Sequence, residues 1–181
     1  MNLKQLLQVA IAGVVATSLP LISAQKSVAQ SAAPLSSFQC QISEDQLFVT
    51  LAVRQNGQVS DPMIVWKTEE FSGAGYTPER RCTEVTNRLN TLLQQNNQSL
   101  QGLYMTAGLV NGEAVLCAVS STRAGCNTRN VLFTLNHANR RNPSQMLRNL
   151  ASAGVVGSGN AIQESGGQPY VDLEILVNQL F

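Results

Sequence analysis

The sequence contains few of the residues from which catalytic and metal sites are usually built. It has one histidine, His137, one tryptophan and four cysteines in 181 residues, and 13% of its residues are charged. No two cysteines are spaced as C-x-x-C, and no G-x-S-x-G motif is present. Redox dithiols, common zinc sites and α/β-hydrolases need those patterns. We therefore predict no enzyme activity, and we assign no catalytic, cofactor-binding or metal-binding residue.

His137 is the centre of the alternative reading as an enzyme. It lies in LNHANRRNP, directly after a strand-like run. A serine and a carboxylate gathered around it would make an envelope hydrolase with an unrecognised site. The polar residues on both sides of His137 instead favour a surface loop.

Residues 1–29 have the pattern of an export signal. Lys4 gives a positive start, residues 6–22 carry no charge, and small residues end a cleavage site at Ala29. The alternative is an uncleaved anchor, because the apolar run is nearly long enough to span a membrane. We expect cleavage, which removes Lys4 and Lys26 and changes the net charge from +1 to −1. Nucleic-acid binding through overall charge is therefore not expected.

All four cysteines follow this signal, so they would reach an oxidising compartment in which disulfides persist. Four cysteines allow three pairings. Cys117 and Cys126 flank the turn-like connector AVSSTRAG, which predicts a local bridge and leaves Cys40 to pair with Cys82. A metal site is the alternative, but a single histidine and the lack of C-x-x-C argue against it.

Alternating apolar and polar residues, together with short β-rich runs, predict six strands. Asn56-Gly57 and Asn111-Gly112 are turn signals between such runs. A helix is predicted over residues 78–96, between the third and fourth strands. This order predicts an α+β fold: a mostly antiparallel curved sheet of about six strands, with the main helix on one face. The predicted strands are residues 38–42, 47–53, 62–66, 103–110, 114–119 and 131–135.

The main helix opens at Thr77-Pro78. A threonine hydroxyl accepts hydrogen bonds from the first-turn amides, and proline at the first helical position loses none. Apolar residues then recur at spacings of three, four and seven, which predicts one buried stripe. Arg81 and Arg88 fall outside this stripe and are assigned to the solvent face. The stripe consists of Cys82, Val85, Leu89, Leu92 and Leu93.

The last third of the chain is less regular. Asn142-Pro143 predicts a short second helix near residues 143–151. Residues 151–168 are rich in glycine and serine and predict a flexible connector. The apolar segment 169–181 is expected to dock on the domain, which spans residues 36–150, and a partner-binding tail is the alternative.

Several motifs together resemble one family. An export leader is followed by FQC, by W…F…GYTPERRC, by GLVNGEAVLC, by C…VLFTL and by NPSQMLRNL. Over residues 38–150 this pattern is similar to the cyanobacterial circadian oscillating protein family. The resemblance implies an exported or membrane-associated protein from a cyanobacterium, of unknown biochemical function. It supplies no catalytic residue.

The second half of the chain holds a stretch of unopposed positive charge. Residues 114–163 contain no acidic residue. Arginine suits carboxylate and phosphate recognition, and a well-placed basic side chain near a membrane contributes about 1 kcal/mol. We therefore expect an anionic membrane surface or an acidic protein as the partner. The alternative is that these arginines lie on different faces and only keep the protein soluble. They are Arg123, Arg129, Arg140, Arg141 and Arg148.

Trp66, Phe71 and Tyr76 lie close together in the sequence and would form an aromatic patch if exposed, with core packing as the alternative. These features predict an exported, non-catalytic binding or assembly domain at a cell-envelope or thylakoid surface. Its location would be the periplasm, the thylakoid lumen or the extracellular space. Besides the hydrolase, an inhibitor or chaperone-like module for an exported protein is an alternative, which an exposed apolar tail at residues 171–181 would favour.

Overall fold

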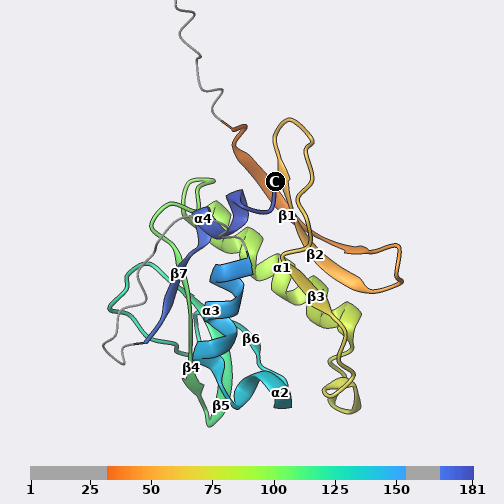
Figure 1. The fold of residues 1–181 in the computed structure, drawn as a ribbon, viewed down its shortest axis with the longest axis vertical. Coiled ribbons are helices and arrows are strands. Elements are labelled where there is room, and N and C mark those ends of the chain that lie inside the picture. The colour runs from red at the N-terminus through yellow and green to blue at the C-terminus, as the bar shows by residue number, and fades with distance from the viewer. Residues whose placement is uncertain (1–31, 154–167) are drawn as a thin grey trace, which may run out of the picture. The chain divides into compact units, whose positions relative to one another are not determined.

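The computed structural model describes residues 32–153 and 168–181. The export signal predicted at 1–29 and nearly all of the predicted connector at 151–168 lie outside these residues. The described part forms two antiparallel sheets with helices packed on them (Figure 1). Its elements are β1 (Leu35–Ile42), β2 (Phe48–Arg54), β3 (Ile64–Trp66), the 3-10 turn η1 (Ser72–Ala74), α1 (Pro78–Gln95), β4 (Tyr104–Val110), β5 (Glu113–Val119), β6 (Val131–Thr134), α2 (His137–Arg140), α3 (Pro143–Ala153), β7 (Tyr170–Asp172) and α4 (Leu173–Asn178).

The α+β class, the six predicted strands and both predicted helices are confirmed, with shifts of one to three residues at their ends. The β4–β5 hairpin turns at Asn111 and Gly112, whose φ angles are 53° and 81°. A two-residue turn with both φ angles positive matches the twist of the flanking strands, which is why Asn-Gly is favoured there. The short α2 helix was not predicted, because the sequence around His137 indicated a loop.

The single curved sheet of about six strands is not confirmed. The strands form a three-stranded sheet, β1-β2-β3, and a four-stranded sheet, β6-β5-β4-β7. Strands β3 and β6 are edges of different sheets, and between them the rings of Trp66 and Phe133 meet edge to face, with centroids 5.2 Å apart. The two sheets therefore meet here through side-chain packing. The additional strand, β7, comes from the apolar tail.

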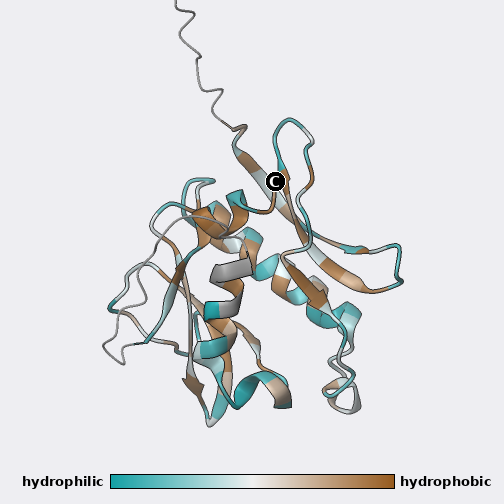
Figure 2. Ribbon diagram, viewed as in Figure 1, coloured by the Kyte–Doolittle hydropathy of each residue, from teal (hydrophilic) through white to brown (hydrophobic). Residues whose placement is uncertain are grey.

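Helix α1 connects the two sheets, with contacts to β1, β2, β3 and β6. Hydrophilic and hydrophobic residues alternate along it (Figure 2). The predicted stripe is buried at Cys82, Val85, Leu89 and Leu93, and Leu92 is partly buried against the same core. The predicted Cys40–Cys82 bridge forms and ties β1 to α1, with Cα atoms 5.6 Å apart.

The first turn of α1 is capped as the sequence predicts. The Thr77 hydroxyl accepts a hydrogen bond of 3.3 Å from the Arg80 amide, and Pro78 occupies the first turn. We expect Thr77→Ala to lower the free energy of unfolding by about 1 kcal/mol, because one first-turn amide loses its acceptor. Thr77→Ser keeps the hydroxyl and should cost about 0.3 kcal/mol or less. Urea denaturation of both variants measures the difference, and equal losses would show that the cap contributes nothing.

The second predicted bridge, Cys117–Cys126, also forms, with Cα atoms 5.6 Å apart. It folds the connection between β5 and β6 back over β4. A Cβ atom on Gly108 of β4 would lie 3.0 Å from both the Cβ and the Sγ atom of Cys126, so glycine permits this close approach. The hydroxyl of Tyr170 in β7 donates to the carbonyl of Ala124 in the same connection, at 2.9 Å.

The tail contacts both sheets. Strand β7 pairs with β4, and the Leu173 amide donates to the Leu103 carbonyl at 3.0 Å. On the other side, the Asp61 amide donates to the Leu180 carbonyl at 2.8 Å. The buried Arg54 of β2 places its guanidinium 4.1 Å from the centre of the Phe181 ring. The apolar side chains of Val171, Leu173, Leu176 and Val177 are buried in the common core.

Among the residues that the structure describes, no helix is both long enough and apolar enough to span a membrane.

Candidate functional site

The structure brings two of the five predicted arginines together. Arg140 ends α2 and Arg141 follows it, and both side chains are exposed. The Nη2 atom of Arg140 lies 2.8 Å from Nδ1 of His137, and that of Arg141 lies 2.9 Å from Nε2 of the same ring. Two guanidinium groups therefore flank one exposed imidazole, and their positive charges lie close together at the end of α2.

The other arginines of the basic stretch lie elsewhere. Arg123 belongs to the connection that folds over β4 toward β7, whereas α2 follows β6 at the opposite edge of the sheet. Arg129 precedes β6, and Arg148 on α3 donates to the Gln145 side chain at 3.1 Å. All three are exposed. The basic stretch is thus spread over several elements, and its densest part is the pair Arg140 and Arg141 at the end of α2.

Among the residues that the structure describes, Arg140 and Arg141 have no acidic partner within ion-pair distance. In the described parts of the chain, the ion pairs join Glu84 to Arg80 at 2.7 Å and to Arg88 at 3.3 Å, both on α1. Glu70 approaches α2, but its two carboxylate oxygens accept from the backbone amide of His137, at 3.0 and 2.8 Å. Within the described ranges, Arg140 and Arg141 therefore remain open to an external anion.

Among the described residues, the ring of His137 contacts two arginines. Its side chain is exposed on α2, and its two ring nitrogens face the two guanidinium groups. In the described residues, no serine or carboxylate is hydrogen-bonded to the ring. A general base needs a hydrogen-bonded proton donor to act on, and a group that orients it.

The three predicted aromatic residues do not form an exposed patch. Trp66 is buried, with 3% of its surface accessible, because β3 packs it between α1 and β6. Its indole nitrogen donates to the Thr50 hydroxyl at 3.0 Å. Phe71 is partly buried, and Tyr76 is exposed beside Arg80, whose guanidinium carbon lies 4.4 Å from the ring centre. The core interpretation is therefore correct for Trp66.

The sequence assigned Arg81 to the solvent face of α1, and this assignment is wrong. Only 9% of Arg81 is exposed. Its guanidinium carbon lies 4.9 Å from the centre of the Trp66 ring and 4.6 Å from that of Phe71. The segment that carries Phe71 folds back over the start of α1 and covers a position that helical periodicity alone would leave open to solvent.

The buried guanidinium of Arg81 is short of hydrogen-bond acceptors. Its Nη1 atom is shielded from solvent and has no hydrogen-bond partner among the described residues. Burial lowers the pKa of Arg81, and the carboxylate of Glu70 partly counteracts this effect. The group still stays charged at neutral pH, because arginine is not deprotonated in proteins.

Arg81 borders a cleft between the free edges of β3 and β6, with a volume of about 530 Å³. Most of its walls are apolar, and amides from α2 and the lysine that follows β3 add polar groups. Sites for small ligands have volumes of about 300–1,000 Å³ and similar walls with few polar groups. The lining consists of Met63, Ile64, Val65, Trp66, Lys67, Thr68, Arg81, Phe133, Leu135, Asn136, Asn139, Met146 and Leu150.

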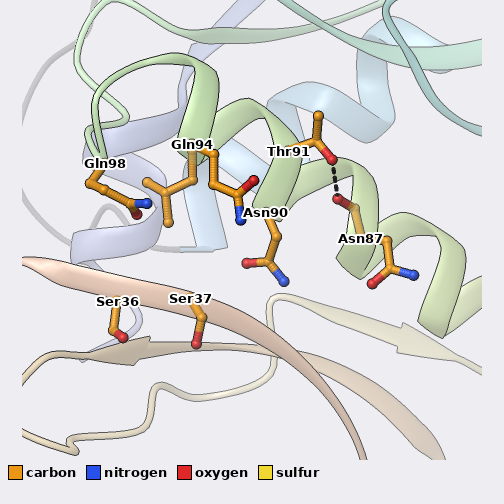
Figure 3. Close-up of a pocket in the computed structure, with 8 residues that line it drawn as sticks. Ser36, Ser37, Asn87, Asn90, Thr91, Gln94 and Gln98 are labelled. Atoms are coloured by element: carbon orange, nitrogen blue, oxygen red, sulfur yellow. Dashed lines mark hydrogen bonds between the residues drawn. The ribbon is translucent and has the colours of Figure 1, made fainter.

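A second hollow of about 430 Å³ lies between β1 and α1 and is lined mostly by hydroxyl and amide groups. Figure 3 shows Ser36 and Ser37 on the strand, and Asn90 and Gln94 on the helix beside it. Asn90 is engaged in the fold, because its side chain accepts from the Phe38 amide at 2.7 Å and donates to the Phe38 carbonyl at 3.0 Å. No charged or aromatic side chain lines this hollow, so it is the weaker candidate for a binding site.

No group of three or more histidine, cysteine or acidic side chains within residues 32–153 and 168–181 is placed to hold a metal ion. In comparisons with known proteins, residues 37–178 match the family model described as "Circadian oscillating protein COP23". This match runs from β1 through α4 and extends beyond the residues 38–150 covered by the sequence resemblance. No curated protein and no solved structure matches the chain.

Proposed function

Because this chain belongs to the circadian oscillating protein COP23 family, whose biochemical function is unknown, we propose a role that is based on its own surface. The protein is a non-catalytic domain that docks on an anionic membrane surface through α2. The observation that carries this proposal is the exposed pair Arg140 and Arg141, which has no carboxylate within ion-pair distance among the described residues. Each basic side chain near an anionic leaflet contributes about 1 kcal/mol. Two such arginines on one short helix favour a weak, reversible, salt-sensitive contact.

The two disulfides indicate an oxidising compartment. We therefore place the membrane contact on the extracytoplasmic side, in the periplasm, the thylakoid lumen or the extracellular space. Export through a cleaved signal at residues 1–29 is part of this proposal.

The absence of catalysis is also part of the proposal. The only histidine of the chain faces two guanidinium groups, and this arrangement favours anion contact over general-base chemistry. An inhibitor or chaperone-like role would be favoured by an exposed apolar tail. Leu173 and Val177 of the tail are instead buried in the core.

Vesicle co-sedimentation tests the proposal. The protein is exported with its own N-terminal segment, purified from the periplasm of an expression host and mixed with phosphatidylglycerol or phosphatidylcholine vesicles at low salt. We expect binding to the anionic vesicles, and Arg140→Glu with Arg141→Glu should weaken it by at least about tenfold, because about 1 kcal/mol is lost for each arginine.

The matched control is Arg123→Glu with Arg129→Glu, which changes the net charge equally on surfaces away from α2. This control should retain most of the binding. Equal weakening by the two double variants would show that net charge, and not α2, decides the contact. Failure of the unmodified protein to bind anionic vesicles would overturn the membrane proposal and point to an acidic protein partner.

A further inference from the structure

We infer that the cleft between β3 and β6 is a binding site for an amphiphilic anion, with Arg81 holding the negatively charged head group and the apolar walls holding its hydrocarbon chain. This site is distinct from the α2 docking contact. The inference rests on three features: a buried arginine whose Nη1 atom has no hydrogen-bond partner among the described residues, apolar walls, and a volume suited to a small ligand.

The first feature is the buried guanidinium of Arg81. The rings of Trp66 and Phe71 interact favourably with the charge of Arg81, but an aromatic face offers its N–H groups no lone pair of the carbonyl or carboxylate kind. A guanidinium removed from water without acceptors is costly. Its planar fork of donors matches the two oxygens of a carboxylate, or those of a phosphate. An anion at the Arg81 end of the cleft would therefore supply acceptors to this guanidinium.

The Glu70 carboxylate does not fill this role. Glu70 influences the pKa of Arg81, yet no ion pair joins the two within the described part of the chain. The Glu70 carboxylate is held by the backbone amide of His137. Because it is engaged at α2, the position beside Arg81 is left for a ligand.

The walls of the cleft determine what the anion must carry. Trp66, Phe133, Leu135, Met146 and Leu150 are apolar and lie on β3, β6 and α3 or just beyond β6. Burial of each methylene group favours binding by about fourfold, so a hydrocarbon chain would add affinity that a bare anion lacks. Methionine is flexible and adapts to chains of different shape. The ligand class is therefore a medium-chain carboxylate or alkyl phosphate.

Trp66 provides a direct signal, because it lines the cleft beside Arg81 and is the only tryptophan of the chain. Its fluorescence is followed while the protein, purified from the periplasm with both disulfides formed, is titrated with decanoate below its micelle concentration. The comparison ligands are decyl phosphate, decanol and acetate. We expect saturable changes with decanoate or decyl phosphate, and binding at least about tenfold weaker for decanol, since a charge-assisted hydrogen bond is worth about 1.5–3 kcal/mol. The better of the two anions identifies the head group.

Arg81→Met removes the charge and leaves an unbranched apolar side chain in its place. Arg123→Met is the matched control at an exposed arginine outside the cleft. We expect Arg81→Met to weaken decanoate binding by at least about tenfold and Arg123→Met to leave it unchanged. If Arg81→Met does not fold, the comparison of decanoate with decanol on the unmodified protein still tests whether the cleft recognises the negative charge. Equal binding of the acid and the alcohol, or no saturable change with either anion, would overturn the inference.

Discussion

Replacing Cys40 and Cys82 together with alanine is expected to lower the free energy of unfolding by about 4 kcal/mol. The bridge closes a long loop whose ends are 42 positions apart in the sequence, and in the chain-entropy model such a bridge restricts the unfolded state strongly. The bridge also holds β1 to α1, the helix that connects both sheets. Guanidinium denaturation followed by circular dichroism, without reductant, measures the loss.

The second disulfide is the matched comparison. The Cys117–Cys126 bridge closes a loop of 9 positions, for which the same model gives about 3 kcal/mol. Cys117→Ala with Cys126→Ala should therefore destabilise the protein less than loss of the longer bridge. The reverse order would show that strain or local packing, and not loop length, determines what each bridge contributes.

Leu173→Ala is expected to lower the free energy of unfolding by about 3 kcal/mol or more. Leu173 is fully buried at the junction of β7 and α4, and truncating such a leucine leaves a cavity. If the tail were an appendage that packs only against a partner, this substitution would have almost no effect on the isolated protein. Thermal and urea denaturation of the purified protein measure it.

Ile175→Ala is the control within the same helix. Ile175 is 49% exposed. Its backbone amide donates to the Asp172 side chain, and the substitution does not remove this hydrogen bond. We expect a loss of about 0.5 kcal/mol or less. Similar losses at both positions would contradict the packing of the tail described here.

Local signals in the sequence were sufficient for much of the fold. The Asn111-Gly112 turn, the Thr77-Pro78 helix start and the spacing of Cys117 and Cys126 each act within a few residues, so the sequence predicts them directly. The division into two sheets is different. It depends on which strands pair, and these strands are far apart in the chain: β3 and β6 end different sheets, and Trp66 packs against Phe133 between them.

The candidate sites also depend on contacts between segments that are distant in the sequence. The basic stretch predicted Arg140 and Arg141, but sequence distance could not show that Arg123 lies on another surface. Arg81 was missed because helical periodicity describes one helix in isolation, whereas a neighbouring segment covers this position. The usable signal was the density of aromatic residues just before the helix. A cation that follows such a segment closely is a candidate for burial between rings.

Both proposals meet at α2. Asn136 and Asn139 of this region line the cleft, and Arg140 and Arg141 follow directly. A membrane contact through the arginines would place the cleft near that membrane. An amphiphilic anion leaving the bilayer would then have a short route to Arg81. The two contacts remain separable, because the vesicle assay depends on α2 and the fluorescence titration depends on Arg81.

Salt washing of membranes from cells that make the protein natively tests the central claim most directly. The Debye length falls from about 10 Å at 0.1 M salt to about 3 Å at 1 M, so a contact made by two exposed arginines should be lost. We predict that the protein sediments with membranes at low ionic strength, without residues 1–29, and is released at high salt. Recovery in the soluble fraction at low ionic strength, or salt-resistant retention with residues 1–29 still attached, would contradict docking through α2.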